Sequence, residues 1–165
     1  MEINIRPYQS KDAKTIVAIL NYYIANSTAL YDYEARTFEQ QQSIFDEKLK
    51  KSFPVIVATI EDKVVGFGYY SEFRFRVAYK FTVEHSVYVA PTEHGKGIGK
   101  VILQNLIGLA KEQKLHTMVG VIDAENESSI AFHEQFGFTT VGIIKESGYK
   151  FDRWLHSVIM QLMLN

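Results

Sequence analysis

An alternating strand that leads into a glycine-rich turn and a helix is the feature of this sequence that most restricts its fold. Between Lys80 and Ala90 the side chains follow the period-two pattern of a half-buried strand. One face is expected to carry Phe81, Val83, His85, Val87 and Val89, and the other Thr82, Glu84, Ser86 and Tyr88. Pro91 ends this strand, and a helix is expected from about residue 99 to residue 113.

The turn between this strand and this helix contains Gly95, Gly97 and Gly99. Because glycine has no Cβ atom, the chain can turn sharply, and successive N–H groups can converge on an anion at the positive end of the helix. The spacing matches neither the G-x-G-x-x-G of dinucleotide-binding folds nor a P-loop, since Val101 follows Lys100 where Ser or Thr is needed. The turn predicts a pyrophosphate site held by amides, and a tight turn without a ligand is the alternative.

The remaining pattern predicts a single domain, residues 1–165. Further strands are expected at about 3–5, 55–60, 64–75, 116–122, 138–146 and 154–163, and further helices at about 11–26, 37–51 and 126–136. Ser10 is expected to cap the first helix, Thr37 with Gln40 has the sequence of a capping box, and Gly137 ends the last helix as a left-handed cap. Strands interrupted by helices on this scale indicate an α+β or mixed α/β sheet covered by helices.

Composition excludes several classes of protein. A formal net charge of -1 and the lack of a Lys/Arg cluster argue against a nucleic-acid partner. The absence of cysteine excludes disulfides, thiolate zinc sites and cysteine nucleophiles. The sequence shows neither the basic flank and apolar core of a secretory signal nor a stretch apolar enough for a membrane span, so we expect a cytoplasmic protein without a membrane partner.

The sequence HGKGIG, preceded by VYVAP, resembles the acetyl-CoA signature of the GNAT family of N-acetyltransferases. That signature usually reads Gln or Arg, two residues, Gly, one residue, then Gly or Ala, and His94 stands here where Gln or Arg is usual. The segments YYIANSTALYDYEART, FRFRVAYKFTVEHSVYV, AFHEQFGF and GYKFDRW are similar, in the same order, to the phosphinothricin and methionine sulfone/sulfoximine acetyltransferase branch. The resemblance covers almost the whole chain.

The resemblance implies the GNAT acyl-CoA N-acyltransferase fold, a central, mostly antiparallel twisted sheet flanked by helices, in which two central strands splay apart and admit the cofactor. It implies acetyl-CoA as co-substrate, no metal, a homodimer and, for this branch, herbicide resistance. A main-chain N–H around residues 87–89 is implied as the donor to the oxyanion of the tetrahedral intermediate. The residues implied to bind acetyl-CoA are Val87, Tyr88, Val89, Gly95, Lys96, Gly97, Ile98, Gly99, Lys100 and Asn126.

Two side chains are candidates for acid–base catalysis. An alkyl ammonium group is protonated at pH 7, so amide formation from a thioester needs a base, and the resemblance favours Glu84. Many relatives use a tyrosine to protonate the departing CoA thiolate, and the matching position here is His133, which could also assist the base. The spacing places Asn126 on the same helix face as His133, where it could hold the pantetheine arm. A solvent-facing Glu84, a helix-capping Asn126 and a packed His133 stay open as alternatives.

Substrate recognition is predicted for the segment FRFR. Its spacing places Arg74 and Arg76 on one face of a strand, and a pair of guanidinium groups suits a carboxylate or phosphinate. The resemblance implies a small-molecule amine with an anionic group, and the residues assigned to its binding are Tyr31, Arg74, Phe75, Arg76, Glu84, His85 and Ser86. Two solvated arginines, an ordinary loop aromatic at position 31 and a core histidine at position 85 are the alternatives.

We therefore expect direct transfer of the acetyl group of acetyl-CoA to the primary amine of a small amino acid analogue, with Glu84 as general base and no acetyl-cysteine intermediate. One alternative is a GNAT enzyme for a protein N-terminus, a polyamine or an aminoglycoside, and the arginine pair disfavours the cationic substrates. A second alternative is a non-catalytic acyl-CoA-binding module. A Rossmann-like nucleotide enzyme is the weakest alternative, because the glycine spacing is broken.

Overall fold

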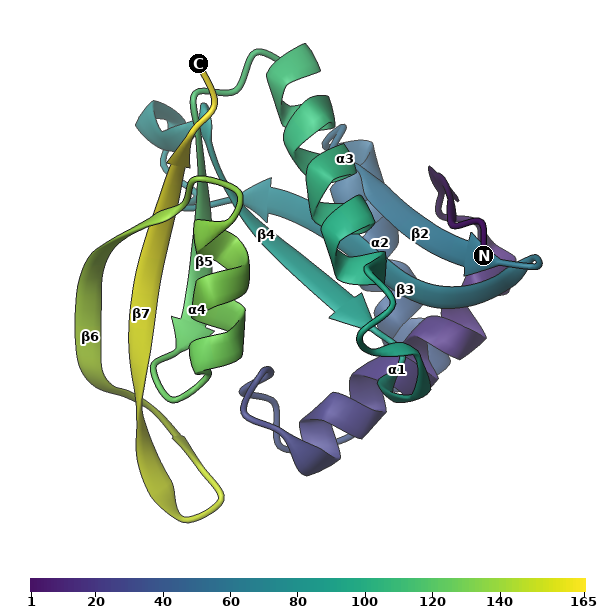
Figure 1. Cartoon of the computed structure of the whole chain (residues 1–165), viewed down its shortest axis with the longest axis horizontal. Coiled ribbons are helices and arrows are strands. Elements are labelled where there is room, and N and C mark those ends of the chain that lie inside the picture. The colour runs from purple at the N-terminus through teal and green to yellow at the C-terminus, as the bar shows by residue number, and fades with distance from the viewer.

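A seven-stranded sheet forms the centre of the computed structural model, which describes all 165 residues (Figure 1). The strands are β1 (Asn4–Pro7), β2 (Val55–Ile60), β3 (Lys63–Glu72), β4 (Thr82–Val89), β5 (Thr117–Asp123), β6 (Thr139–Lys150) and β7 (Arg153–Met163). Their order across the sheet is β1-β2-β3-β4-β5-β7-β6, and all neighbours are antiparallel except β4 and β5. The predicted mixed, mostly antiparallel sheet is confirmed.

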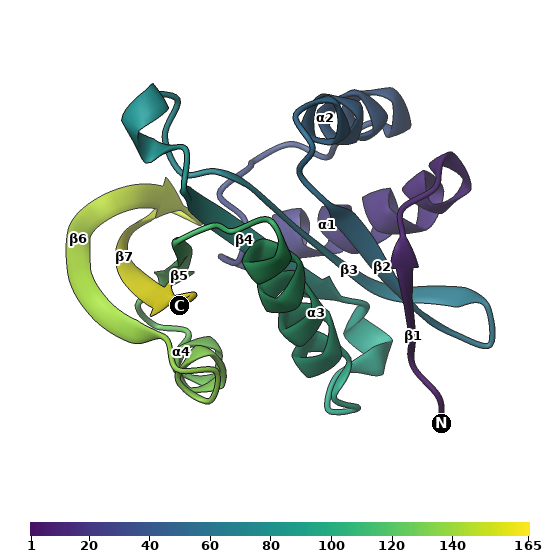
Figure 2. The same ribbon diagram turned by 90° about the horizontal axis from the view of Figure 1, so that it is seen from above.

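Helices cover both faces of the sheet (Figure 2). They are α1 (Ala13–Asn26), α2 (Phe38–Lys50), α3 (Ile98–Glu112) and α4 (Glu127–Glu134), and none has the length and apolar character needed to cross a membrane. The core under α1 and α2 contains Ile16, Leu20, Phe45, Val55, Val57, Phe67 and Tyr88. The core under α3 contains Ile56, Ala58, Val83, Ile98, Ile102, Leu106 and Met118. Adjacent residues of β2 therefore belong to different cores, as expected for a strand that is buried on both faces.

Strand β4 differs from the half-buried strand that its alternation predicts. Val83 is buried in the core under α3, but Tyr88, expected on the polar face, is 8% exposed and stacks on Phe67 with ring centroids 5.2 Å apart. The predicted half-buried pattern fails at Tyr88, because this residue belongs to the core under α1 and α2, whereas Thr82, Glu84 and Ser86 on the same face are partly exposed. The alternation within one strand carries no information about a helix that packs on it from elsewhere in the chain.

The strands β4 and β5 separate in the middle of the sheet (Figure 1). They pair at only three positions, the last of which joins Glu84 to Val119. Beyond this point β4 stays paired with β3 as far as Val89, and β5 stays paired with β7 as far as Asp123. Each strand therefore keeps one partner and turns a free edge towards the gap, which is the splay that the family resemblance implies.

The connection from β3 to β4 corrects one prediction about the arginine pair. The strand β3 ends before the expected boundary at residue 75, and Phe73 N–H makes a last bond to the carbonyl of the first β4 residue (3.2 Å). The chain then passes through a 3-10 turn at Val77–Tyr79. Arg74 and Arg76 thus lie on this connection and not on one face of a strand. The alternation of Phe and Arg in FRFR is typical of a strand, but the chain reverses direction in this segment to enter β4, so the segment is not part of the sheet.

Of the two helix N-caps predicted from the sequence, the structure confirms one, at Thr37. Gln40 N–H donates to Thr37 Oγ1 (3.2 Å) and Thr37 N–H donates to Gln40 Oε1 (2.9 Å), so the predicted capping box is present. Ser10 does not cap α1, because it opens a 3-10 turn that ends at Asp12. The Asp12 carboxylate accepts the hydrogen bond from Gln9 N–H (2.8 Å) and is itself held by a nearby arginine at 2.7 and 2.8 Å.

Candidate active site

A cavity of about 830 Å³ occupies the split between β4 and β5, within the size range of small-molecule sites. Its walls come from residues 85–89 of β4, residues 120–123 of β5, the turn before α3, and α4 with the residue that caps it. All the residues expected to bind acetyl-CoA line this cavity except Lys96. The Lys96 ammonium instead pairs with Glu93 at 2.6 Å.

The turn before α3 presents free main-chain donors to the cavity. Gly95 and Gly97 have φ angles of 77° and 78°, in the left-handed region that favours glycine, and Gly97 is the N-cap of α3. No main-chain carbonyl accepts a hydrogen bond from the N–H groups of residues 94–100. Gly99 belongs to the first turn of α3 and has no positive φ. These free amides at the positive end of a helix form a site for an anion such as a pyrophosphate.

His94, at the position where the family signature usually has Gln or Arg, anchors this turn to α1. The Tyr23 hydroxyl donates to the Val89 carbonyl (2.6 Å), so His94 Nε2 must donate its proton to the Tyr23 oxygen, also at 2.6 Å. Burial raises the pKa of Tyr23 to about 12, which keeps the hydroxyl protonated. His94 therefore fixes the turn through a side-chain contact within the protein.

Glu84 lies where the split between β4 and β5 begins. It is the last β4 residue that pairs with β5, and it shares a face with Ser86, which lines the cavity. Burial raises the pKa of Glu84, while Arg74 and Lys48 lower it. A carboxylate with a raised pKa holds a proton more readily near neutral pH, which suits a general base.

On the opposite face of β4, His85 contacts His133 of α4. Their Nε2 atoms are 2.9 Å apart, and the two residues are 6% and 7% exposed. His85 Nδ1 lies 3.0 Å from the Val119 carbonyl, and His133 Nδ1 lies 2.7 Å from the Ser129 carbonyl. Both nitrogens of His133 are therefore engaged within the protein, and its partner is His85 and not Glu84.

Gly120 makes room for this histidine pair and was not predicted. A Cβ atom at position 120 would lie 3.0 Å from His85 Cε1 and 3.7 Å from His133. The sequence around Gly120 carries no signal for this role, because both rings come from other elements. Asn126 caps α4 by accepting from Ser129 N–H (3.2 Å) and also lines the cavity, so the capping role and the predicted cofactor contact are compatible.

Residues 74–76, which are expected to bind the amine, are exposed on the connection between β3 and β4. Arg74 and Arg76 are exposed, and each guanidinium lies over the ring of the preceding phenylalanine, 5.0 and 5.1 Å from its centroid. Phe75 is 83% exposed. Of these three, only Arg74 influences the pKa of Glu84, so the structure brings one of the two arginines close to the candidate base.

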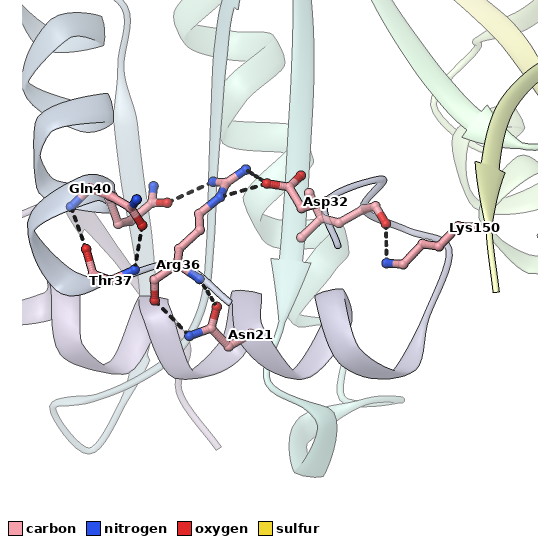
Figure 3. Close-up of polar contacts among 8 residues, drawn as sticks. Asn21, Asp32, Arg36, Thr37, Gln40 and Lys150 are labelled. Carbon is pink, nitrogen blue, oxygen red and sulfur yellow. Dashed lines mark hydrogen bonds and ion pairs between the residues drawn. The ribbon is translucent and has the colours of Figure 1, made fainter. Parts of the chain in front are cut away.

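Tyr31 and its loop are tied to the hairpin formed by β6 and β7. The Tyr31 hydroxyl lies 3.3 Å from Ser157 Oγ, and its ring is so close to Gly148 that a Cβ there would come within 2.5 Å. Lys150 is 4% exposed and donates to two main-chain carbonyls of the loop, at 2.8 and 2.6 Å, and one of these bonds is visible in Figure 3. The β6–β7 hairpin thus holds the loop that follows α1.

Arg36 holds the other end of the same loop (Figure 3). Its guanidinium donates to Asp32 at 3.1 and 2.9 Å and to Gln41 Oε1 at 2.8 Å, and its main chain exchanges two hydrogen bonds with the Asn21 amide. Residues 32–36 are not helical, so the spacing of Asp32 and Arg36 in the sequence did not predict their ion pair. No three His, Cys, Asp or Glu side chains come together so as to hold a metal ion.

Comparisons with known proteins agree with this geometry. Residues 5–159 match the family described as acetyltransferase (GNAT) domain. The chain is 37% identical to the L-methionine sulfoximine/L-methionine sulfone acetyltransferase of Pseudomonas paraeruginosa, over 100% of this chain and 96% of that protein. An N-acetyltransferase from Staphylococcus aureus Mu50 has a TM-score of 0.98 and 38% identity, with 100% of both chains covered. A GNAT superfamily phosphinothricin acetyltransferase from Sinorhizobium meliloti in complex with acetyl-CoA has a TM-score of 0.96 and 34% identity, over 100% and 90% of the two chains.

Proposed function

Because this chain belongs to the GNAT family and is an acetyl-CoA-dependent N-acetyltransferase, we propose that its acceptor is the primary amine of a small amino acid analogue of the phosphinothricin, methionine sulfone or methionine sulfoximine type. One observation carries the proposal. The split between β4 and β5 runs from the free amides of residues 94–100 to Ser86, beside the point where Glu84 leaves the pairing with β5, and Glu84 itself does not line the cavity. The pyrophosphate of the co-substrate and the reacting amine can thus occupy opposite ends of one site.

In this mechanism Glu84 takes a proton from the substrate ammonium, directly or through one water. The neutral amine then attacks the thioester carbonyl. The edge of β4 beyond Glu84 has no strand partner, so main-chain N–H groups in residues 87–89 are available to the developing oxyanion. The thiolate of CoA leaves as the tetrahedral intermediate collapses. Without a cysteine, the acetyl group passes straight to the amine.

A screen of acceptors tests the proposed substrate class. CoA release is measured with acetyl-CoA and free amino acids, methionine sulfone, methionine sulfoximine, phosphinothricin, polyamines, aminoglycosides and short peptides. We expect turnover to be fastest with the amino acid analogues, because Arg74 offers a guanidinium to an anionic group near the base. Turnover confined to polyamines, aminoglycosides or peptides would contradict the proposal.

Arg74→Ala is expected to raise KM for an anionic amine roughly tenfold, the value of about one charge-assisted hydrogen bond. Because Arg74 lowers the pKa of Glu84, its removal lets that pKa rise. Activity needs the ionised base, so the acidic limb of the pH profile of kcat/KM should move to higher pH. Arg76→Ala is the matched variant: it should also raise KM but should leave the acidic limb in place. Equal shifts of the limb in both variants would show that Arg74 has no special relation to the base.

We also propose a homodimer, based on apolar side chains that are exposed on β6 and the β6–β7 hairpin. These residues are Val141, Ile143, Ile144, Tyr149, Phe151 and Trp154, with exposures from 44% to 60%. Such a patch on an edge strand is typical of an interaction surface. Sedimentation equilibrium is expected to give about twice the chain mass of 18.9 kDa, and Ile143→Lys is expected to shift the protein towards the monomer. A wild-type protein that is monomeric at all concentrations would contradict the proposal.

A further inference from the structure

The contacts of His85 and His133 constrain the number of protons on the two rings. A carbonyl oxygen can only accept a hydrogen bond, so each Nδ1 atom must carry a proton to bond the carbonyl of Val119 or of Ser129. The contact between the two Nε2 atoms at 2.9 Å needs one further proton. The three contacts therefore require three protons, whereas two neutral imidazoles hold two.

A neutral pair would leave one of these contacts unmade. Either the two Nε2 lone pairs would face each other, or one Nδ1 lone pair would face a carbonyl oxygen in the protein interior, where a missing hydrogen bond is costly. Burial opposes charge on the rings, lowering the pKa of His133 and, together with His133, lowering the pKa of His85 to about 3. These two directions oppose an extra proton on the pair, whereas the three hydrogen-bond contacts require one, and a single proton shared by the two rings completes every contact at the cost of one buried charge.

No carboxylate neutralises this shared charge. The carboxylates carried by β4, β5 and α4 are Glu84, Asp123, Glu127 and Glu134. Glu84 is on the opposite face of β4, Asp123 binds Thr28, and the two α4 glutamates are exposed. The other ring neighbours are Phe132 and Phe138, and both histidines line the cavity. A buried cation without a protein partner suits an anion that forms in that cavity.

We propose that His85 and His133 share one excess proton and that the resulting cation stabilises the CoA thiolate as it departs. This inference rests on the proposed function, which places the thioester where the split begins. The nitrogen–carbon bond forms, the carbon–sulfur bond breaks, and sulfur takes the electron pair. The ammonium nitrogen releases two protons in all, of which one ends on sulfur and one reaches solvent. The pair keeps its own proton, and His85 acts as a positioning residue for His133.

Nuclear magnetic resonance of the free protein tests the shared proton without any substrate. In protein with ¹⁵N-labelled histidine at pH 7, we expect both Nδ1 atoms to be protonated and one low-field proton to couple to both Nε2 atoms. His85→Phe should abolish that signal, whereas His116→Phe, at an exposed position, should retain it. A spectrum in which one Nδ1 of the pair lacks its proton would overturn the proposal.

Kinetics test the role of the charge. His85→Phe and His133→Phe are each expected to lower kcat about 100-fold, as for loss of one preorganised stabilising group, with little change in KM for acetyl-CoA. The double variant should lose no more than either single variant, because the two rings act as one unit. In the pH profile of the wild type, kcat should fall at high pH as the pair loses its proton. The single variants should not show this fall. An unchanged kcat in folded His85→Phe would overturn the proposal.

A glycine variant tests the geometry while both imidazoles remain. Gly120→Ala would bring a Cβ atom to 3.0 Å from His85 Cε1, so the His85 ring must shift. We expect both a lower kcat and a weaker low-field proton signal. Gly142→Ala meets no atom within 4 Å and should change neither. If the acceptor screen identifies another amine, the resonance experiment on the free protein still decides the state of the pair. Failure of the proposed substrate and failure of the shared proton are therefore distinguishable.

Discussion

Glu84→Gln is expected to lower kcat by roughly 10²- to 10⁴-fold, the usual contribution of a positioned general base. The amide is nearly isosteric with the carboxylate but cannot take a proton from the substrate ammonium. Glu84 is suited to this task by position, where β4 and β5 separate, and by environment, since burial raises its pKa. The measurement is steady-state CoA release with the best acceptor from the screen, at saturating acetyl-CoA.

The stability of this variant provides the control. A carboxyl group whose pKa is raised in the folded state binds its proton more tightly there, so its ionisation lowers stability as pH rises through that pKa. Glu84→Gln should therefore be at least as stable as the wild type at pH 7. Glu72→Gln, on the neighbouring strand and paired with Lys51, should keep its activity. Full turnover by folded Glu84→Gln would remove the glutamate from the mechanism.

Gly97→Val is expected to raise the dissociation constant of acetyl-CoA roughly 5- to 150-fold, equivalent to about 1–3 kcal/mol of backbone strain. Gly97 has a φ of 78° and is the N-cap of α3, and a β-branched residue rarely adopts this conformation. In the variant without acetyl-CoA, the turn before α3 should relax to an unstrained backbone conformation. Binding of acetyl-CoA must then restore the strained conformation in which the amides point at the phosphates, and this costs affinity. Calorimetric titration with acetyl-CoA gives the constant directly.

Gly108→Val is the matched control for this effect. Gly108 is an exposed residue of the same helix, has no positive φ, and a Cβ there would meet no atom within 4 Å. Valine is no worse than glycine in a helix, so affinity should not change. Equal affinity of the Gly97 variant and the wild type would mean that the geometry of this turn does not hold the cofactor.

Features that depend on neighbours in sequence were predictable. The strand, turn and helix between residues 80 and 113 are present as β4, the turn with two left-handed glycines, and α3. The capping box at Thr37 is confirmed, and Gly137 has the predicted positive φ of 89° after α4. The family and its fold are confirmed as well, because the motif is local and the similar segments follow one order along the chain.

Features that depend on distant segments were not predictable. Arg74 and Arg76 have the alternation of a strand, yet the return of the chain into β4 removes them from the sheet. The partner of His133 is His85, 48 positions away, and Gly120 makes room for both rings. Which of these residues act in catalysis or substrate binding stays a prediction for the experiments above.

The sequence by itself determined the elements and the cofactor-binding turn, because alternation, the proline stop and glycine freedom act over a few residues. Only the tertiary structure decided where the strands separate and which side chains meet there. β4 and β5 part because each is held by a different outer partner, β3 or β7, through pairings far apart in the chain. The contact of His85 with His133 follows from the same folding, which brings α4 against the split.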